Sequence, residues 1–206
     1  RLDVDVMDDL ETAGLAFGRL SAQFIRDKVV PELDAFRFAS YCGISGVTKK
    51  EETLADGAAT VAALSAAVTA LDDEEVTATG RYLFITPTLL QGINDMDTTK
   101  SKKVLEGFEQ VIKVPQRRFY TAIKQLSGKT GEEAGGYTKA TGAANINFAI
   151  VQKDALIQYT KHAAPKIIAP ENNPDADAYV FGYRMVGIAK AYKNMLSGMY
   201  FSHDKA

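Results

Sequence analysis

Residues 7–39 read MDDLETAGLAFGRLSAQFIRDKVVPELDAFRFA, and this stretch predicts the long helix on which the fold is built. Asp8 or Asp9 can cap its start, because a short carboxylate accepts hydrogen bonds from the exposed amide groups of a first turn. Apolar residues then recur at spacings of three and four, as on one side of a helix, down to about Val30. This narrow stripe consists of Leu10, Ala13, Phe17, Leu20 and Phe24.

Pro31 should kink this helix or restart it, because proline lacks the amide donor of a helix interior but suits a first turn. Phe36 and Phe38 continue the apolar character beyond it, and Gly43 and Gly46 should end the helix. In the other direction, residues 2–6 alternate apolar and acidic side chains, which is the period of a strand. We expect this strand to need a partner outside the chain, and the start at Arg1 suggests that an upstream segment is missing.

A second long helix is expected from Thr48, because Thr48 and Glu51 match a capping box. Its apolar stripe would be Leu54, Ala58, Val61, Leu64, Val68 and Leu71. A neighbouring backbone could approach its alanine-rich side closely, at positions 55, 58, 59, 62, 63, 66, 67 and 70. The sequence therefore predicts close lateral packing by this helix.

The middle of the chain alternates short strands with turns. Residues 81–85 have strand composition, and Thr86-Pro87 should start a short helix over residues 88–95. Two further strands are expected around Pro115, at residues 111–114 and 118–123. Residues 128–142 contain five glycines and predict a mobile loop.

The last third is expected to be mostly strand. Residues 146–151 predict a strand, residues 154–162 a helix, and residues 166–168 a strand that stops at Pro170. After a turn at residues 172–175, the alternation from Tyr179 to Val186 predicts a long strand, with 198–203 as its shorter neighbour. Helices come first, mixed elements follow and strands come last, so the fold class is α+β.

Composition excludes several classes of protein. The 206 residues carry 24 Lys and Arg against 26 Asp and Glu, so a net charge of -2 argues against tight, sequence-independent nucleic-acid binding. No run approaches the roughly 18 apolar residues of a membrane span, and no charged-then-apolar segment at the start resembles a signal peptide. The single cysteine, Cys42, lies among apolar residues and is expected to be buried in a protein of a reducing compartment.

Motifs for catalysis or metal binding fail on inspection. The Gly-Lys-Thr at residues 128–130 lacks the upstream glycine of a phosphate-binding loop, and residues 43–46 are one residue short of a nucleophile elbow. His162 and His203 are predicted to be solvated surface residues. We therefore expect no catalytic residue, no cofactor-binding residue, no metal ligand and no cofactor.

Charged clusters are assigned to the surface. The acidic groups of residues 5–11 and 72–75 lack the spacing of a calcium loop and are interpreted as helix caps and exposed ends. Five of the basic residues between positions 100 and 118 form a group that is interleaved with Glu106 and Glu109. This pattern predicts a solvated face or ion pairs between subunits. The group comprises Lys100, Lys102, Lys103, Arg117 and Arg118.

Five segments in order resemble major capsid proteins of tailed bacteriophages and prophages with the HK97-type shell fold. Besides residues 7–39 they are RYLFITPTLLQGI (81–93), VPQRRFYTAI (114–123), GGYTKATGAANINFAIVQKDALIQYTKHAAPKI (135–167) and NPDADAYVFGYRMVGIAKAYKNMLSGMYFSH (173–203). The resemblance is one of pattern and order over most of the chain. It carries over no active-site residue and no motif for the lysine–asparagine crosslink of some relatives.

The resemblance implies a structural capsid subunit and no enzyme. Residues 1–7 would be the returning strand of an extended loop, with the N-terminal arm and the rest of that loop missing. Residues 8–75 would form a peripheral domain with the spine helix and the alanine-rich helix, 76–163 an axial domain, and 164–206 the C-terminal strands of the peripheral domain. Many copies would form hexamers and pentamers of an icosahedral shell around double-stranded DNA, without sequence-specific binding or a membrane, with a scaffold protein as a possible partner. The location would be the virion capsid, and the host cytoplasm before assembly.

Three other functions stay open. The first is the shell protein of an encapsulin-like bacterial compartment, which has the same fold and encloses cargo enzymes. The second is a small enzyme that uses the glycine-rich loop as a lid over Lys129 and Glu132 or Glu133. The third is a sugar- or surface-binding module displayed through the same loop.

Overall fold

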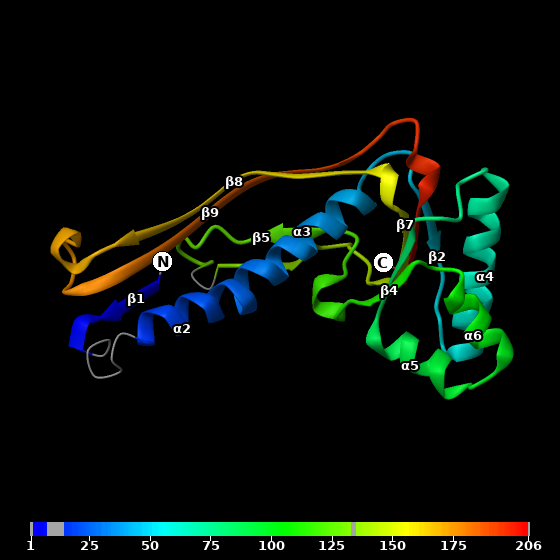
Figure 1. Ribbon diagram of the computed structural model, residues 1–206, viewed down its shortest axis with the longest axis horizontal. Helices are drawn as coiled ribbons and strands as arrows, with labels where there is room; N and C mark the ends of the chain where they lie inside the picture. Colours follow the sequence, from blue (N-terminus) through cyan, green and yellow to red (C-terminus); the bar gives the residue numbers. More distant parts are fainter. Residues whose placement is uncertain (1, 8–14, 133–134, 206) are drawn as a thin grey trace. The chain divides into compact units, whose positions relative to one another are not determined.

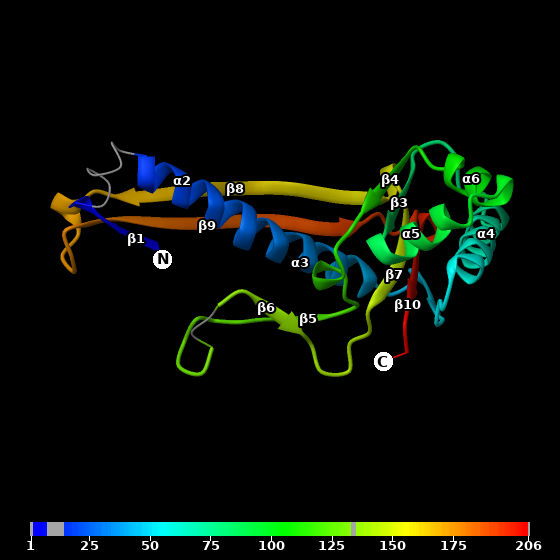
Figure 2. The same cartoon turned by 90° about the horizontal axis from the view of Figure 1, so that it is seen from below.

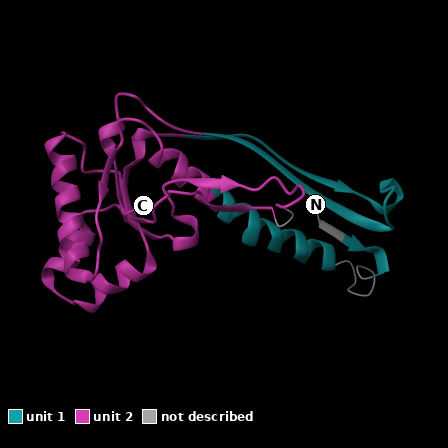
Figure 3. Cartoon of the chain, turned by 180° about the vertical axis from the view of Figure 1, so that it is seen from behind, with its two compact units in different colours: residues 1–33, 158–188 teal, residues 34–157, 189–206 magenta. Residues whose placement is uncertain are grey.

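A computed structural model describes residues 2–7, 15–132 and 135–205, and it divides the chain into two compact units (Figure 3). Unit 1 consists of residues 1–33 and 158–188, and unit 2 of residues 34–157 and 189–206. These boundaries differ from the expected 8–75, 76–163 and 164–206. The alanine-rich helix and the last strand both belong to unit 2, together with the strands of residues 81–152.

One helical rod begins in unit 1 with α2 (Leu15–Phe24), widens into a π-helical turn at Ile25–Val29 and continues as α3 (Val30–Cys42) (Figure 1). The amide of Val30 donates to the carbonyl of Ile25, so this hydrogen bond spans five residues. The expected disturbance at Pro31 is thus a wide turn just before the proline. The cap at Asp8 or Asp9 and the stripe residues Leu10 and Ala13 lie outside the described residues.

Unit 1 also contains a three-stranded sheet in the order β1 (Leu2–Asp5), β9 (Ala178–Ala191), β8 (Leu156–Ile168) (Figure 2). β1 runs antiparallel to β9, with Leu2 opposite Phe181. The expectation that this first strand lacks a partner within the chain was therefore wrong. Phe17 of α2 packs against the rings of Tyr179 and Phe181, with ring centres 5.5 and 6.2 Å away.

The helix predicted over residues 154–162 was also wrong. A 3-10 turn at Lys153–Ala155 leads directly into β8, whose 13 residues form one side of a long hairpin with β9. Pairing with β9 satisfies the backbone groups of a segment that contains β-formers such as Tyr159 and Thr160, and this overrides its weak helical pattern. The predicted strand at residues 166–168 is the end of β8, and the long strand from Tyr179 is confirmed as part of β9.

Unit 2 is built on a five-stranded sheet. Its order is β2 (Thr48–Glu51), β10 (Met199–His203), β7 (Ile146–Gln152), β3 (Arg81–Ile85) and β4 (Gln110–Lys113). The strands expected at 81–85, 111–114, 146–151 and 198–203 are all present. β10 is not a neighbour of the long strand, however, because it pairs parallel with β2 and antiparallel with β7.

The capping box at Thr48 was a wrong assignment. Residues Thr48–Glu51 form the edge strand β2, whose backbone pairs with β10. The second helix, α4 (Gly57–Asp73), starts later, and its cap is Asp56, whose carboxylate accepts a hydrogen bond of 2.7 Å from the amide of Ala59. Backbone pairing with residues 199–203 stabilises a strand here more than the four-residue capping motif stabilises a helix start.

Two shorter helices follow in unit 2. α5 (Pro87–Asp95) starts after Thr86, as predicted. α6 (Thr99–Glu106) was not predicted, although Thr98 and Ser101 form a reciprocal cap at its start. The expected strand at 118–123 is instead a 3-10 turn at Gln116–Arg118, followed by the short ribbon of β5 (Ile123–Gln125) and β6 (Tyr137–Lys139).

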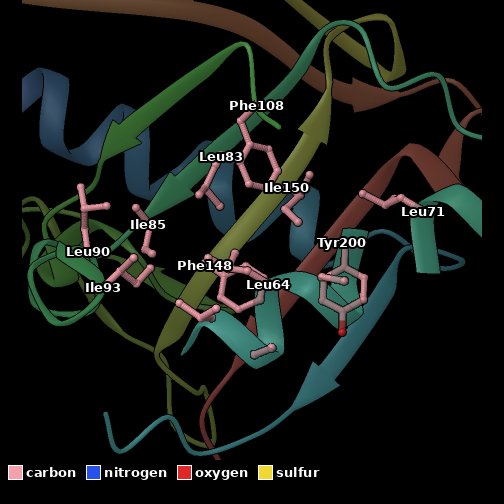
Figure 4. Close-up of a cluster of buried hydrophobic side chains, with 13 residues drawn as sticks. Leu64, Leu71, Leu83, Ile85, Leu90, Ile93, Phe108, Phe148, Ile150 and Tyr200 are labelled. Atoms are coloured by element: carbon pink, nitrogen blue, oxygen red, sulfur yellow. The ribbon is translucent and has the colours of Figure 1, made fainter. Parts of the chain in front are cut away.

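Apolar residues fill both faces of the sheet. On one face Leu83, Phe148 and Ile150 pack with Leu64 of α4 and Ile93 of α5 (Figure 4). A second cluster contains Tyr41 and Cys42 of α3, and Phe119, Met199 and Phe201. Cys42 is 2% exposed, which confirms its predicted burial.

The alanine-rich helix packs closely on α5 at one pair of glycines. A Cβ placed at Gly57 would overlap the carbonyl group of Gly92, whereas a Cβ at Gly92 would meet Gly57 at 3.5 Å, an ordinary contact. The substitution Gly57→Ala should therefore lower the free energy of unfolding by about 1–3 kcal/mol, the usual range for overpacking. Gly92→Ala should be neutral or stabilising by up to about 1 kcal/mol, because alanine favours a helix interior.

Urea unfolding followed by circular dichroism measures both variants, with an unchanged slope as the sign that only stability has changed. Equal midpoints for the two variants would contradict the asymmetric contact.

Candidate interaction surfaces

Arg81 is the most deeply buried cation among the described residues, and it fixes the chain that follows α4. Its side chain is 3% exposed and forms a 2.7 Å ion pair with Asp72. The guanidinium also donates to the carbonyl groups of Val76 and Thr77. Three partners satisfy a buried charge that would otherwise be unfavourable, so the role of Arg81 is structural.

A polar cluster connects three strands at one end of the sheet of unit 2. Ser202 of β10 donates to Glu52 at 2.6 Å, and the side-chain amide of Asn147 in β7 donates to the Glu52 carbonyl oxygen at 3.0 Å. Lys50 of β2 pairs with the second oxygen of Glu52 at 3.1 Å. The Ser202 side chain is fully buried, so this cluster fastens β2 to the sheet and offers no accessible nucleophile.

An open cavity of about 220 Å³ in unit 2 lies beside the end of α4. Glu74, Glu75, Gln152 and Asp154 are among its lining residues. The Gln152 amide is engaged within the protein, because it accepts from the Asp154 amide and donates to the Asp154 carboxylate. The lining residues include carboxylates but no histidine or cysteine. Such a lining does not have the arrangement of an acid–base or nucleophilic site.

The glycine-rich loop between β5 and β6 is closed by Glu132. One carboxylate oxygen accepts from the amide and the hydroxyl of Ser127, both at 2.9 Å, and the other binds the Lys124 ammonium at 2.6 Å. The Lys124 hydrogen bond, together with those from Ser127, lowers the pKa of Glu132 to about 2. Glu132 thus holds its own loop together, and Glu133 lies outside the described residues.

The two histidines belong to different units, and two residues of the basic group form ion pairs within unit 2. His162 is exposed on β8, and the ring of His203 lies 2.7 Å from the Asp204 carbonyl oxygen. Lys102 pairs with Asp97 and Arg118 with Asp34, both within unit 2. In the described part of the chain, no group of three or more histidine, cysteine or acidic residues is placed to hold a metal ion.

Across the described residues, no helix combines the length and the apolar character that crossing a bilayer requires.

The surface of the β8–β9 hairpin is unusual for its exposed apolar side chains. Tyr159 is 63% exposed, Ile167 58%, Ile188 44% and Val186 42%. Large apolar side chains that gather on one exposed element indicate a contact surface rather than a core. The sequence predicted the long strand from Tyr179 to Val186, but the helix wrongly expected at residues 154–162 concealed the second strand of this surface.

Comparison with solved structures identifies the fold. A structure from Mycobacterium phage Che8 matches with a TM-score of 0.61 and 12% identity, over 98% of this chain and 68% of the other. The capsid of cyanophage P-SCSP1u matches with a TM-score of 0.55 and 16% identity, over 98% and 70%. The virus-like particle of Pyrococcus furiosus matches with a TM-score of 0.50 and 11% identity, over 84% and 63%.

No protein-family model matches the chain, and no curated protein matches its sequence. The identities to the solved structures are so low that the likeness concerns the fold. The chain has the α+β fold of these capsid structures, which confirms the expected fold class.

Removing the Arg81 charge should destabilise the protein strongly. Arg81→Met leaves the carbonyls of Val76 and Thr77 and the Asp72 carboxylate without their donor, so the free energy of unfolding should fall by about 2–3 kcal/mol. The matched control is Lys102→Met, which removes an exposed ion pair and should change stability by less than about 0.5 kcal/mol. Urea unfolding compares them, and similar losses in both variants would disprove the anchoring role of Arg81.

The Glu132 contacts should respond to acid. Because the folded pKa is lowered to about 2, their stabilising effect on the loop is present above the unfolded pKa near 4.5 and is lost as the pH falls towards 2. In a ¹H–¹⁵N NMR titration, the Ser127 amide should shift with a midpoint of about 2 in the native protein. It should show no such transition in Glu132→Gln, and a midpoint near 4.5 in the native protein would refute the contacts.

Proposed function

We propose that this chain forms the major capsid subunit of a tailed bacteriophage or prophage and assembles into an icosahedral shell around double-stranded DNA. The observation that carries the proposal is the fold likeness over 98% of the chain to the capsid of cyanophage P-SCSP1u. The mature capsid of bacteriophage PhiM1 adds support, with a TM-score of 0.51, 10% identity and coverage of 98% of this chain and 69% of the other. The role of this chain in the shell would be mechanical, and the chain would catalyse no reaction.

Within such a subunit, we assign unit 1 to the peripheral domain and unit 2 to the axial domain. Unit 1 has the rod of α2 and the long β8–β9 hairpin, which suit a thin, extended part of a shell. Unit 2 has a closed core on both faces of its sheet, which suits a compact wedge around a symmetry axis. In this assignment α4 and β10 belong to the axial domain, in contrast to the expectation from sequence.

Assembly would proceed through heterologous contacts, in which different surfaces of neighbouring copies meet and close into hexamers and pentamers. Exposed apolar residues such as Tyr159 and Ile167 provide contact area for this. The net charge of -2 suits a shell that encloses DNA without gripping it in a sequence-specific way. The same proposal includes a scaffold protein as a partner during assembly, and the host cytoplasm as the location of the subunit before assembly.

A compartment shell is the second candidate. The likeness to the virus-like particle from Pyrococcus furiosus supports it, although that match covers less of both chains. The enzyme with a glycine-rich lid has less support, because the Glu132 carboxylate is occupied by Ser127 and Lys124 of its own loop. The surface-binding module has no specific observation in its favour.

Expression of the gene that encodes this chain tests the proposal. We expect closed particles of uniform size in negative-stain electron microscopy, and packaged double-stranded DNA in particles isolated from the phage or the induced prophage. Particles that contain a cargo enzyme and no DNA would support the compartment instead. A protein that stays monomeric at high concentration, with or without its neighbouring genes, would count against both.

A further inference from the structure

The β8–β9 hairpin separates its charges along its length. In unit 1, the strand segments 158–168 and 178–188 contain Lys161, Lys166 and Arg184 and no carboxylate. The turn between them, residues 169–177, contains Glu171, Asp175 and Asp177 and no cation. The body of the hairpin is therefore positive and its tip negative, although the whole chain is close to neutral.

Strand alternation places the cations of the body beside exposed apolar residues. Side chains alternate along β9, so Arg184, Val186 and Ile188 point to one face. Gly187 lies opposite β8, where a Cβ on it would meet the Tyr159 carbonyl oxygen at 3.2 Å and the Thr160 Cα at 3.9 Å.

Gly187 thus lies opposite Thr160, and residues directly opposite each other in an antiparallel pair point to the same face. The neighbours of Thr160, which are Tyr159 and Lys161, therefore share the other face with Val186 and Ile188. We call these five residues the hairpin face: Tyr159, Lys161, Arg184, Val186 and Ile188.

Protection of a sheet edge does not account for the hairpin face. β8 is an edge strand, and lysines on such strands commonly prevent unwanted pairing. β9 pairs with β1 only over Ala178–Phe181, so edge protection could extend to Arg184 as well. It gives no reason, however, for the exposure of Val186 and Ile188, which would favour aggregation rather than prevent it.

The chemistry of the hairpin face fits an acidic protein segment better than nucleic acid. Phosphate contacts are made by Lys, Arg and polar groups, whereas exposed aliphatic side chains such as Val186 and Ile188 gain from burial against other apolar atoms. The tip of the hairpin is such a segment, because residues 170–177 read PENNPDAD and so combine three carboxylates with two prolines and an alanine. Glu171 and Asp177 are both exposed.

The tip lies far from the hairpin face of its own copy. Lys161 lies seven residues before the end of β8 at Ile168, which is roughly 23 Å along a strand. This distance is well beyond the screening length of about 8 Å at physiological salt. Among the described residues Lys161, Arg184, Glu171 and Asp177 also form no ion pair.

We propose that the hairpin face of one copy binds the acidic hairpin tip, Glu171 and Asp177, of a second copy of this chain. This head-to-tail contact is heterologous, so it leaves a free tip and a free face for further copies. It rests on the proposed function as a shell subunit, for which it names one of the contact surfaces. Charge would select the partner and the apolar residues would add buried area.

Two charge-reversal variants of the protein, as its gene encodes it, test the contact. One carries K161E and R184E and the other E171K and D177K. Sedimentation velocity at about 50 mM and 500 mM salt measures self-association, since the contact should weaken as salt screens it. Each variant alone should associate about tenfold more weakly than the native protein, because like charges then meet. An equimolar mixture should recover association to within about threefold, since the negative face of one variant meets the positive tip of the other.

The control is K113E/K153E, which makes the same change in net charge as K161E/R184E on exposed positions of unit 2 and should leave association unchanged. Circular dichroism of each variant confirms that it is folded. Reversing the sign keeps the β8 edge charged, so aggregation is not expected to increase.

The inference and the proposed function fail in different ways. If both variants form particles as well as the native protein does, or if the mixture does not recover association, the tip-to-face contact is overturned and the shell proposal still stands. Salt-dependent association that follows the charge swap without closed particles would support the contact and overturn the shell. A gel shift of double-stranded DNA that K161E/R184E abolishes, with self-association unchanged, would assign the face to nucleic acid and overturn the inference.

Discussion

The burial of β7 on both faces is the constraint on which unit 2 depends. All seven residues from Ile146 to Gln152 are buried, and the strand pairs with β3 on one side and β10 on the other. Phe148 and Ile150 enter one apolar cluster, while Ala149 and Val151 enter the other. Of this strand only Gln152 borders the open cavity, so most of β7 serves as a rigid support within the core.

The polar groups of unit 2 are consistent with that role. Arg81 is satisfied by the chain that follows α4, and Ser202, Asn147 and Lys50 are all engaged through Glu52. Burial raises the pKa of the Cys42 thiol, which keeps it protonated and unreactive. Satisfied polar groups fix the positions of strands and helices, whereas catalytic sites usually contain groups that are held ready for a substrate.

Unit 1 has the opposite character. Its aromatic contacts join α2 to one end of the hairpin, where Phe17 and Phe24 meet Tyr179 and Phe181, and much of β8 is exposed. An exposed strand with apolar and charged residues gains stability from association with other molecules. Unit 2 has a buried core with satisfied polar groups, whereas unit 1 exposes apolar and charged side chains. This contrast fits a subunit that acts through contacts with other subunits rather than through a ligand pocket.

The sequence by itself determined the elements whose signals are local. The 3.6-residue spacing of Phe17, Leu20 and Phe24 predicts the rod, and the buried strands at 81–85 and 146–151 are evident from their apolar composition. The order of its segments also led to the correct fold class. Tertiary structure decided what depends on partners distant in sequence: Thr48–Glu51 is a strand because β10 lies beside it, and residues 156–162 are a strand because β9 does. A local pattern fixes which face of a segment is apolar, but only the assembled chain supplies the neighbour that satisfies its backbone hydrogen bonds.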